Sequence, residues 1–223
     1  MSTARIILIN KPYDWTSFDV VKYIKKALGG VKIGHAGTLD PLATGLLVLC
    51  TGSLTKSITE IQDAEKEYSG TLVLGATTAS YDLETETTER MDVTHLSLEK
   101  IRDAAQHFVG EILQTPPSHS AVKIGGRRAY AMARNEESFQ IQPKKVVISV
   151  FEITRFDLPE ISFRVVCGKG TYIRSLAHDF GKALGCGAHL TSLCRTRIGK
   201  YSLEDALEPA QFSRKEAEKE SLS

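Results

Sequence analysis

Strand-like and helix-like segments alternate along this 223-residue chain, but without the regular spacing that a doubly wound parallel sheet requires. Residues 146–156 and 161–167 are two apolar runs separated by a short turn, which is typical of an antiparallel pair of strands. A chain of this length can bury a full hydrophobic core. We therefore predict an α+β fold, with helices flanking a mixed, mainly antiparallel sheet.

The helices are predicted from apolar periodicity and from their end signals. Val20, Ile24 and Leu28 recur on one face of a helix that Ser17 caps and Gly29 ends. The other predicted elements are a strand at 5–9 with a turn at 10–12, a helix after Ser53, a strand at 68–74, a helix capped by Ser97, a helix from about Thr171 to Gly185, and a strand or two before Tyr201.

The bulk composition predicts an ordinary folded protein. Hydrophobic residues make up 42% of the chain and charged residues 25%. Because no apolar run is long enough to cross a bilayer and no signal-peptide core follows Met1, we expect a cytoplasmic protein without membrane contact. The four cysteines form no CxxC pair, which indicates reduced thiols. Cys186, His189 and Cys194 match no common zinc spacing, so no metal site is predicted.

The charge is distributed unevenly although the net charge is only +1. Residues 57–115 carry 4 Lys/Arg and 12 Asp/Glu, whereas residues 116–200 carry 14 Lys/Arg and 6 Asp/Glu. The basic block is compatible with binding to a nucleic-acid backbone. A solvated surface would give the same pattern, so charge alone does not decide between the two.

Residues 34–47 are rich in glycine and small polar side chains, which suits a constrained loop whose backbone comes close to a ligand. Asp40 precedes Pro41, so its backbone is biased away from the helical region. A lone Asp-Pro pair is usually a turn in which the carboxylate caps the backbone. From these residues alone, Asp40 is therefore either a turn cap or a presented carboxylate.

The whole segment resembles the GHxGTLDPxAxGxL motif of the bacterial tRNA pseudouridine synthases of the TruB family. Further motifs occur in the family's order: Asn10-Lys11-Pro12 with Thr16-Ser17, the strand from Tyr68 to Leu74-Gly75, Pro116-Pro117 to Lys123, and Lys169-Gly170-Thr171-Tyr172-Ile173-Arg174. The resemblance covers most of the chain and implies the pseudouridine synthase fold. It also implies an isomerase that converts uridine at position 55 in the tRNA T loop to pseudouridine, without metal or organic cofactor.

The resemblance assigns a role to individual residues. Asp40 matches the catalytic carboxylate, and Arg174 matches the arginine expected to pair with it. Tyr68 matches a tyrosine that stacks on the target base, and His35 matches a histidine that helps to hold that base extruded. Tyr172 and Leu193 match pocket-lining positions and Lys56 a nearby lysine, but these residue types are common. Taken individually, a strand tyrosine such as Tyr68 is more often a core residue. His35 alone would be read as a satisfied polar residue, and Arg174 as a surface arginine.

The resemblance also predicts how the chain is organised. The catalytic domain is expected at residues 1–208, with an insertion at about 116–143 that closes over the T arm of the tRNA. This insertion carries Lys123, Arg127, Arg128, Arg134 and Tyr130, although its composition would equally suit an exposed loop. Residues 209–223 are expected to be a short, charged tail with a frayed helical end from Arg214, instead of the full C-terminal PUA domain of many relatives.

The expected partner is tRNA, without an obligatory protein partner, and the protein is expected to be a monomer. Two alternatives remain at this point. The chain could be a non-catalytic RNA-binding or tRNA-folding module, in which Asp40→Asn would leave function intact. It could also be a pseudouridine synthase that acts on another RNA.

Overall fold

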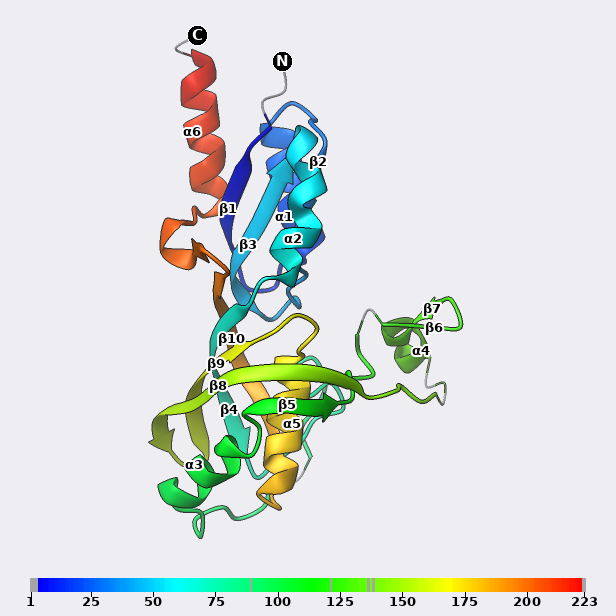
Figure 1. Ribbon diagram of the computed structural model, residues 1–223, viewed down its shortest axis with the longest axis vertical. Coiled ribbons are helices and arrows are strands. Elements are labelled where there is room, and N and C mark those ends of the chain that lie inside the picture. Colours follow the sequence, from blue (N-terminus) through cyan, green and yellow to red (C-terminus); the bar gives the residue numbers. More distant parts are fainter. Residues whose placement is uncertain (1–3, 89, 121, 136, 138, 222–223) are drawn as a thin grey trace. The chain divides into compact units, whose positions relative to one another are not determined.

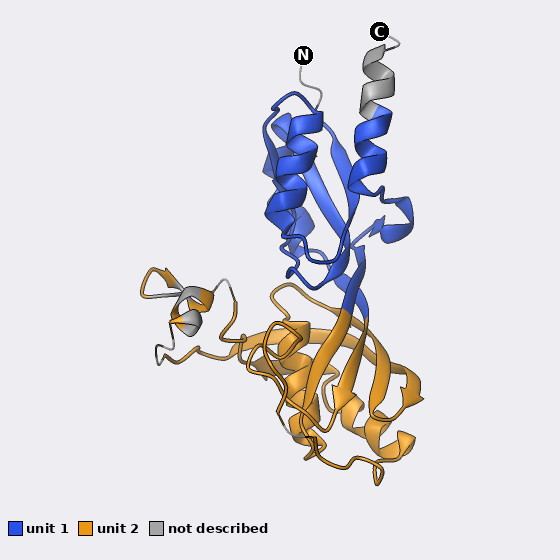
Figure 2. Ribbon diagram, turned by 180° about the vertical axis from the view of Figure 1, so that it is seen from behind, with its two compact units in different colours: residues 1–69, 193–223 blue, residues 70–192 orange. Residues whose placement is uncertain are grey.

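The computed structural model describes residues 4–88, 90–120, 122–135, 137 and 139–221, and the chain divides into two compact units (Figure 2). Unit 1 combines residues 1–69 and 193–223, and unit 2 is residues 70–192. Unit 1 is therefore built from both ends of the chain. The sequence patterns do not predict this division, and the boundary of the catalytic domain at residue 208 stays a prediction.

Unit 1 contains strands and helices that are interspersed along the chain (Figure 1). Its elements are β1 (Ile6–Lys11), α1 (Ser17–Ala27), β2 (Ile33–His35), β3 (Thr44–Thr51), the 3₁₀ helix η1 (Gly52–Ser57), α2 (Ile58–Asp63), the first residues of β4 (Lys66–Leu74), the last residues of β10 (Ala188–Ile198), β11 (Tyr201–Ser202), the 3₁₀ helix η2 (Leu203–Asp205) and α6 (Pro209–Ser221).

Strand β3 is buried on both faces, which explains its nearly continuous apolar sequence. Because side chains alternate along a strand, Leu47 and Leu49 join one core cluster together with Val20 of α1. Leu46 and Val48 join a second cluster that includes α2. The two helices therefore cover opposite faces of β3 and fix the strand that follows the Asp40 segment.

Unit 2 is a second helix-and-strand layer. Its elements are the last residues of β4, α3 (Leu98–Gln106), β5 (Gly110–Gln114), β6 (Lys123–Ile124), β7 (Arg127–Arg128), α4 (Ala129–Arg134), β8 (Lys144–Asp157), β9 (Glu160–Cys167), α5 (Ile173–Ala183) and the first residues of β10. Phe151 of β8 makes edge contacts with Phe163 and Phe180 at centroid distances of 6.0 and 5.1 Å. These rings join α5 to the sheet.

The strands follow the hydrogen-bonding order β1-β3-β10-β4-β9-β8-β5, with β2 on β3 and β11 on β10. β3 pairs antiparallel with β1 and β2 but parallel with β10. β8 pairs antiparallel with β5 and β9. The predicted α+β fold with a mixed, mainly antiparallel sheet is confirmed, and so are the strand pair β8–β9 and the helices α3 and α5.

Two local predictions near the N-terminus are wrong. Thr16, not Ser17, caps α1, because its hydroxyl accepts a hydrogen bond from Asp19 N at 3.1 Å while the Asp19 carboxylate accepts one from Thr16 N at 2.9 Å. The turn expected at 10–12 is also incorrect for Asn10 and Lys11. Both residues continue β1 and pair with β3, so the turn comes later.

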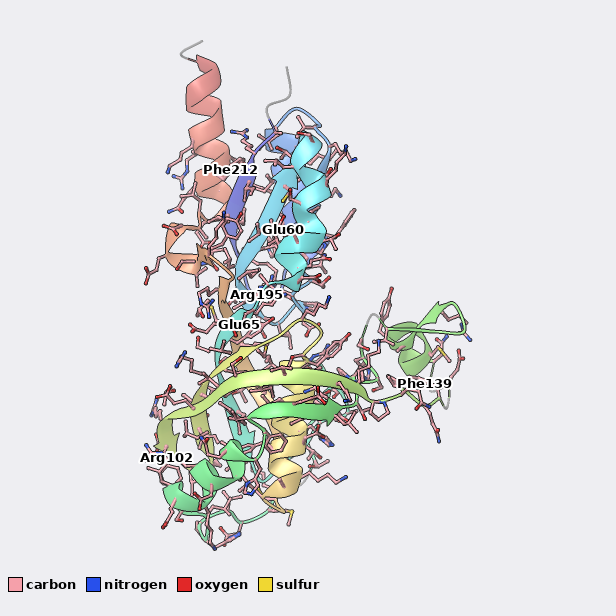
Figure 3. The ribbon with its side chains drawn as sticks, viewed as in Figure 1. Glu60, Glu65, Arg102, Phe139, Arg195 and Phe212 are labelled. Atoms are coloured by element: carbon pink, nitrogen blue, oxygen red, sulfur yellow. The ribbon has the colours of Figure 1, made fainter. Side chains whose placement is uncertain are left out.

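The tail forms a helix, as expected, and the insertion also contains regular structure. The segment 209–221 forms α6, and Phe212 is buried in the core cluster of unit 1 (Figure 3), so the tail is anchored at its start. The insertion forms the β6–β7 hairpin and α4. Arg127 makes a bidentate pair with Glu137, with nitrogen–oxygen distances of 2.7 and 2.5 Å. The side chains of Lys123, Arg128 and Arg134 lie outside the described part.

The cysteines are free thiols, and three of them are buried. The Cys186 thiol donates to Gly187 O at 3.4 Å, and His189 Nδ1 lies 2.9 Å from Ala76 O, so both are ordinary buried residues. Within the described ranges, no three His, Cys, Asp or Glu side chains are grouped to hold a metal ion. Across the same residues, no helix combines the length and apolar character needed to span a bilayer.

Candidate active site

Asp40 lies in a short loop between β2 and β3. The loop comprises residues 36–43, so the constrained segment is shorter than its composition suggests, because Thr44–Leu47 already belong to β3. Asp40 is half-buried and its carbonyl accepts a hydrogen bond from Ala43 N at 3.1 Å, which closes a turn around Pro41. The backbone at the aspartate is therefore fixed locally before any side chain contributes.

Arg195 of β10 (Figure 3) holds this loop through hydrogen bonds to the backbone. Its side chain is fully buried, and its guanidinium donates to three backbone carbonyls. Nε donates to Leu46 O at 2.9 Å, Nη1 to Thr38 O at 3.3 Å and Nη2 to Gly37 O at 3.0 Å. A planar guanidinium can donate in several fixed directions at once, so one residue ties both ends of the loop to β10.

The glycine after Thr44 makes this arrangement possible. Gly45 has a φ of +99°, and a Cβ there would lie 2.4 Å from Arg195 O and 2.7 Å from Arg195 N. Only a residue without a side chain permits β3 and β10 to approach so closely. Gly45 and Arg195 are also register partners in the parallel pairing of the two strands.

Ser17, the first residue of α1, holds the residue before the aspartate. Its hydroxyl accepts from Leu39 N at 2.9 Å and donates to Leu39 O at 3.2 Å. Ser17 and Leu39 are both buried. Because Leu39 precedes Asp40 directly, the helix start fixes the backbone from which the carboxylate projects.

Lys11, at the end of β1, holds the residue after the aspartate. Its side chain is fully buried and donates to Pro41 O at 3.0 Å, Pro12 O at 2.9 Å and Trp15 O at 2.5 Å. Burial lowers the pKa of Lys11 to about 8, and the negative charge of Asp40 opposes that shift. The ammonium group is therefore an electrostatic neighbour of the predicted catalytic carboxylate.

Four more of the residues predicted for the site belong to unit 1. His35 ends β2, directly before the loop, and burial lowers the pKa of its imidazole, which favours the neutral form. Tyr68 is buried in β4. Leu193 lies in β10, and its carbonyl accepts from Thr44 Oγ1 at 3.4 Å. Lys56 is exposed in η1 at the other end of β3, so of these residues it has the weakest geometric support.

Arg174 and Tyr172 belong to unit 2, at the start of α5. Arg174 is buried, so its interpretation as a surface arginine is wrong. Nη1 donates to Ser80 O at 3.2 Å and Nη2 to His119 O at 3.0 Å, and Nη1 lies 3.6 Å from the carboxylate of Asp82. The predicted pairing of Arg174 with Asp40 stays a prediction.

Tyr172 is held in place through its backbone. Tyr172 N donates to the amide oxygen of Gln114 at 2.8 Å, and the Gln114 amide nitrogen donates to Tyr172 O at 3.1 Å. Gln114 is itself buried at the end of β5. This reciprocal pair fixes the residue at the N-terminus of α5.

The sequence patterns assigned no role to the residues that hold the Asp40 loop in unit 1, Lys11, Ser17 and Arg195. They also assigned none to Gln114 and Asp82, which contact Tyr172 and Arg174 within unit 2. A weak signal existed for two of them. Lys11 belongs to the Asn10-Lys11-Pro12 motif, although it was predicted to lie in a turn, and Arg195 stands inside a strand-like stretch, where a buried cation needs partners. Their partners are backbone carbonyls of a loop, and no side-chain pattern announces these.

The chain matches known families along nearly its whole length. Residues 25–173 match the family described as TruB family pseudouridylate synthase (N terminal domain), and residues 174–222 match the tRNA pseudouridylate synthase B C-terminal domain. The tRNA pseudouridine synthase B of Flavobacterium johnsoniae is 52% identical over 215 residues, which is 93% of this chain and 94% of that protein. The protein of the same name from Bacteroides fragilis is 49% identical, with coverages of 93% and 92%.

Solved structures with the same fold include the Cbf5-Nop10-Gar1 complex, with a TM-score of 0.69 and 34% identity over 88% of this chain and 49% of that chain. The archaeal box H/ACA sRNP Nop10-Cbf5 complex gives a TM-score of 0.71 and 30% identity over 95% of this chain and 53% of that one. The chain thus spans about half the length of these solved proteins.

Together, the mixed sheet and the family matches define the class of protein: an isomerase of the pseudouridine synthase type. The clamped aspartate loop lies within the matched region. The chain belongs to the TruB family of pseudouridylate synthases. The family resemblance inferred from the motifs is thereby confirmed.

Proposed function

We propose that this enzyme converts uridine at position 55 in the T loop of tRNA to pseudouridine, with Asp40 as the catalytic carboxylate. The observation that carries the proposal is the loop geometry: Arg195, Ser17 and Lys11 fix the backbone on both sides of Asp40. A carboxylate that reacts with a positioned sugar needs such preorganisation. The tRNA substrate is inferred from the relatives named tRNA pseudouridine synthase B.

The reaction breaks the bond from ribose C1′ to N1 of uracil, turns the base, and joins C1′ to C5. C5 then loses its proton, and N1 gains one, so the product is an isomer of the substrate. Asp40 either attacks C1′ or removes a proton from the sugar to give a glycal. Both routes require the ionised carboxylate. The reaction rearranges bonds within one molecule and consumes no co-substrate, so the proposal includes no metal or organic cofactor.

The charges around the loop favour the ionised form of Asp40. With a pKa of about 8, Lys11 is mainly protonated at neutral pH, and a nearby ammonium stabilises a carboxylate. In the proposal, Arg174 supplies a second positive charge once the base is bound.

The remaining residues are proposed to bind the flipped-out nucleotide. Tyr68 stacks on the target base, and His35 packs within the RNA loop and helps to hold that base extruded. Tyr172 and Leu193 line the base pocket, and Lys56 contacts the RNA. Each of these residues lies in a helix or strand or at the end of one. Lys56 is exposed.

The proposed partner is the T arm of tRNA, over which the insertion at 116–143 closes. Tyr130 is 39% exposed on α4, where an aromatic ring is available to RNA. We propose that the enzyme works as a cytoplasmic monomer without an obligatory protein partner.

The test is tritium release from an unmodified tRNA transcript that contains [5-³H]uridine. Native enzyme is compared with Asp40→Asn, and the transcript is compared with one that carries cytidine at position 55. Asp14→Asn is the matched control, because Asp14 is exposed in the same unit and its φ of 62° is one that asparagine tolerates.

Release that requires both Asp40 and the position 55 uridine, and that survives Asp14→Asn, supports the proposal. Release that does not depend on position 55 keeps the chemistry but refutes the target. Tight tRNA binding without release, and unchanged by Asp40→Asn, would support a non-catalytic RNA-binding module instead.

A further inference from the structure

The solvent side of α1 has an unusual composition. Phe18 is 70% exposed, and Lys22, Lys25 and Lys26 are also exposed, whereas Val20 on the inner face is fully buried. A large aromatic side chain left in water among three cations is not needed for the amphipathic packing of the helix. It is a combination that binds nucleic acid, since bases stack on aromatic rings and phosphates attract lysines.

Within α1 itself, little negative charge opposes the three lysines. Asp19 is the single acidic residue between Ser17 and Ala27. Its carboxylate accepts hydrogen bonds from Thr16 N at 2.9 Å and from Thr16 Oγ1 at 2.5 Å as part of the helix cap. The only negative side chain of the helix is therefore committed to the cap at its N-terminus.

This side of α1 begins next to the Asp40 loop within unit 1. Ser17 exchanges hydrogen bonds with Leu39, and Phe18 is the next residue of the helix. On the other side of the aspartate, Asp14 N donates to Pro41 O at 3.0 Å, and the preceding Tyr13 is 56% exposed. Two exposed aromatic residues therefore follow directly from the segments that hold the loop.

We propose that Tyr13, Phe18, Lys22, Lys25 and Lys26, here called the α1 surface, bind the RNA strand next to the target uridine. This inference rests on the proposed function. Phe18 stacks on an unpaired base beside the target, and the lysines contact the phosphates that lead away from it. From Phe18 to Lys26 the helix rises about 12 Å, which matches about three to four nucleotides of a stacked strand.

The test measures the dissociation constant of the full chain for an unmodified tRNA transcript over a series of KCl concentrations. Phe18→Ala removes the stacking ring, Phe18→Trp retains one, and the combination Lys22→Gln, Lys25→Gln and Lys26→Gln removes the cations. The matched controls are in unit 2. Leu113→Ala removes an apolar side chain of equal exposure, 69%, and Lys100→Gln with Arg102→Gln and Lys182→Gln removes three exposed cations.

Phe18→Ala is expected to weaken binding about tenfold, and Phe18→Trp to restore it. The triple lysine variant is expected to weaken binding about tenfold and to reduce the slope of log K against log salt by about 2, since each phosphate contact on a single strand contributes about 0.7. Both unit 2 controls are expected to stay within about twofold of the native chain.

The inference would be overturned if Phe18→Ala and the triple lysine variant both bound the transcript with the dissociation constant of the native chain. So would an equal loss in the unit 2 charge variant, which would indicate a general effect of net charge. The result is separable from the proposed function: if the native chain binds the transcript without releasing tritium, the proposed reaction fails, while the binding constants still decide on the α1 surface.

Discussion

Replacing Arg195 by lysine tests how far the loop depends on its clamp. The guanidinium donates to the carbonyls of Gly37, Thr38 and Leu46, and a lysine ammonium in the same place can keep about one of these three bonds. A hydrogen bond to a charged group contributes about 1.5–3 kcal/mol. The loss of two bonds should therefore lower the free energy of unfolding by about 3–6 kcal/mol, a large part of the stability of a typical domain.

Urea unfolding followed by tryptophan fluorescence measures this loss, because Trp15 is the single tryptophan of the chain and lies in unit 1. Arg197→Lys is the control: it stands two residues further along β10, is partly exposed, and bonds to Gly199 O and to Glu65. That change should cost less than about 1 kcal/mol. If Arg195→Lys lies within about 1 kcal/mol of the native protein, the clamp does not hold the loop.

Three further predictions concern the same supports. The pKa of Lys11 is about 8 in the folded protein, below its ordinary value of 10.5, so the unfolded state binds more protons between about pH 8 and 10.5. The free energy of unfolding should therefore rise with pH over this range. Urea unfolding should show this rise for the native chain but not for Lys11→Met. Gly45→Ala should lower the free energy of unfolding by more than about 3 kcal/mol and lower the melting temperature accordingly. Gly30→Ala, at a φ of +90° with nothing near its Cβ position, should cost only about 1 kcal/mol. Calorimetry that finds equal losses for the two variants would contradict the close approach of β3 and β10. Gln114→Leu removes both bonds to the backbone of Tyr172 and should destabilise unit 2 by about 2 kcal/mol, measured by hydrogen exchange at the start of α5, where unchanged protection would refute the role of the amide.

Local patterns predicted the elements whose stability is local. Ser97 caps α3, where it accepts from Lys100 N at 3.3 Å, as its position before an apolar stripe indicated. The strand pair β8–β9 followed in the same way from two apolar runs and a short turn. These signals lie within a few residues of the structure that they determine.

The start of β3 could not be predicted from local pattern. Thr44 and Gly45 look like loop residues, because glycine at a positive φ is typical of turns, yet Gly45 pairs with Lys11 in the sheet. The need for glycine there comes from the close approach of Arg195, a residue far away in the chain. Composition therefore assigned a strand residue to a loop.

The catalytic candidate was predicted from its motif, but its supports were not. Asp40 is identified by a motif of fourteen consecutive residues, whereas Lys11 and Arg195 act through backbone carbonyls that any residue could provide. The division into two units was missed for a similar reason. Unit 1 brings both ends of the chain together, and only long-range contacts define it.

The distance along the chain between Arg195 and its carbonyl partners, 149 to 158 residues, has a consequence for synthesis on the ribosome. A chain is made from its N-terminus and folds as its segments emerge. The Asp40 loop leaves the ribosome early, but the guanidinium that fixes it follows only after all of unit 2 has been made. The segment that carries the chemistry is thus among the first to be translated and among the last to reach its final shape.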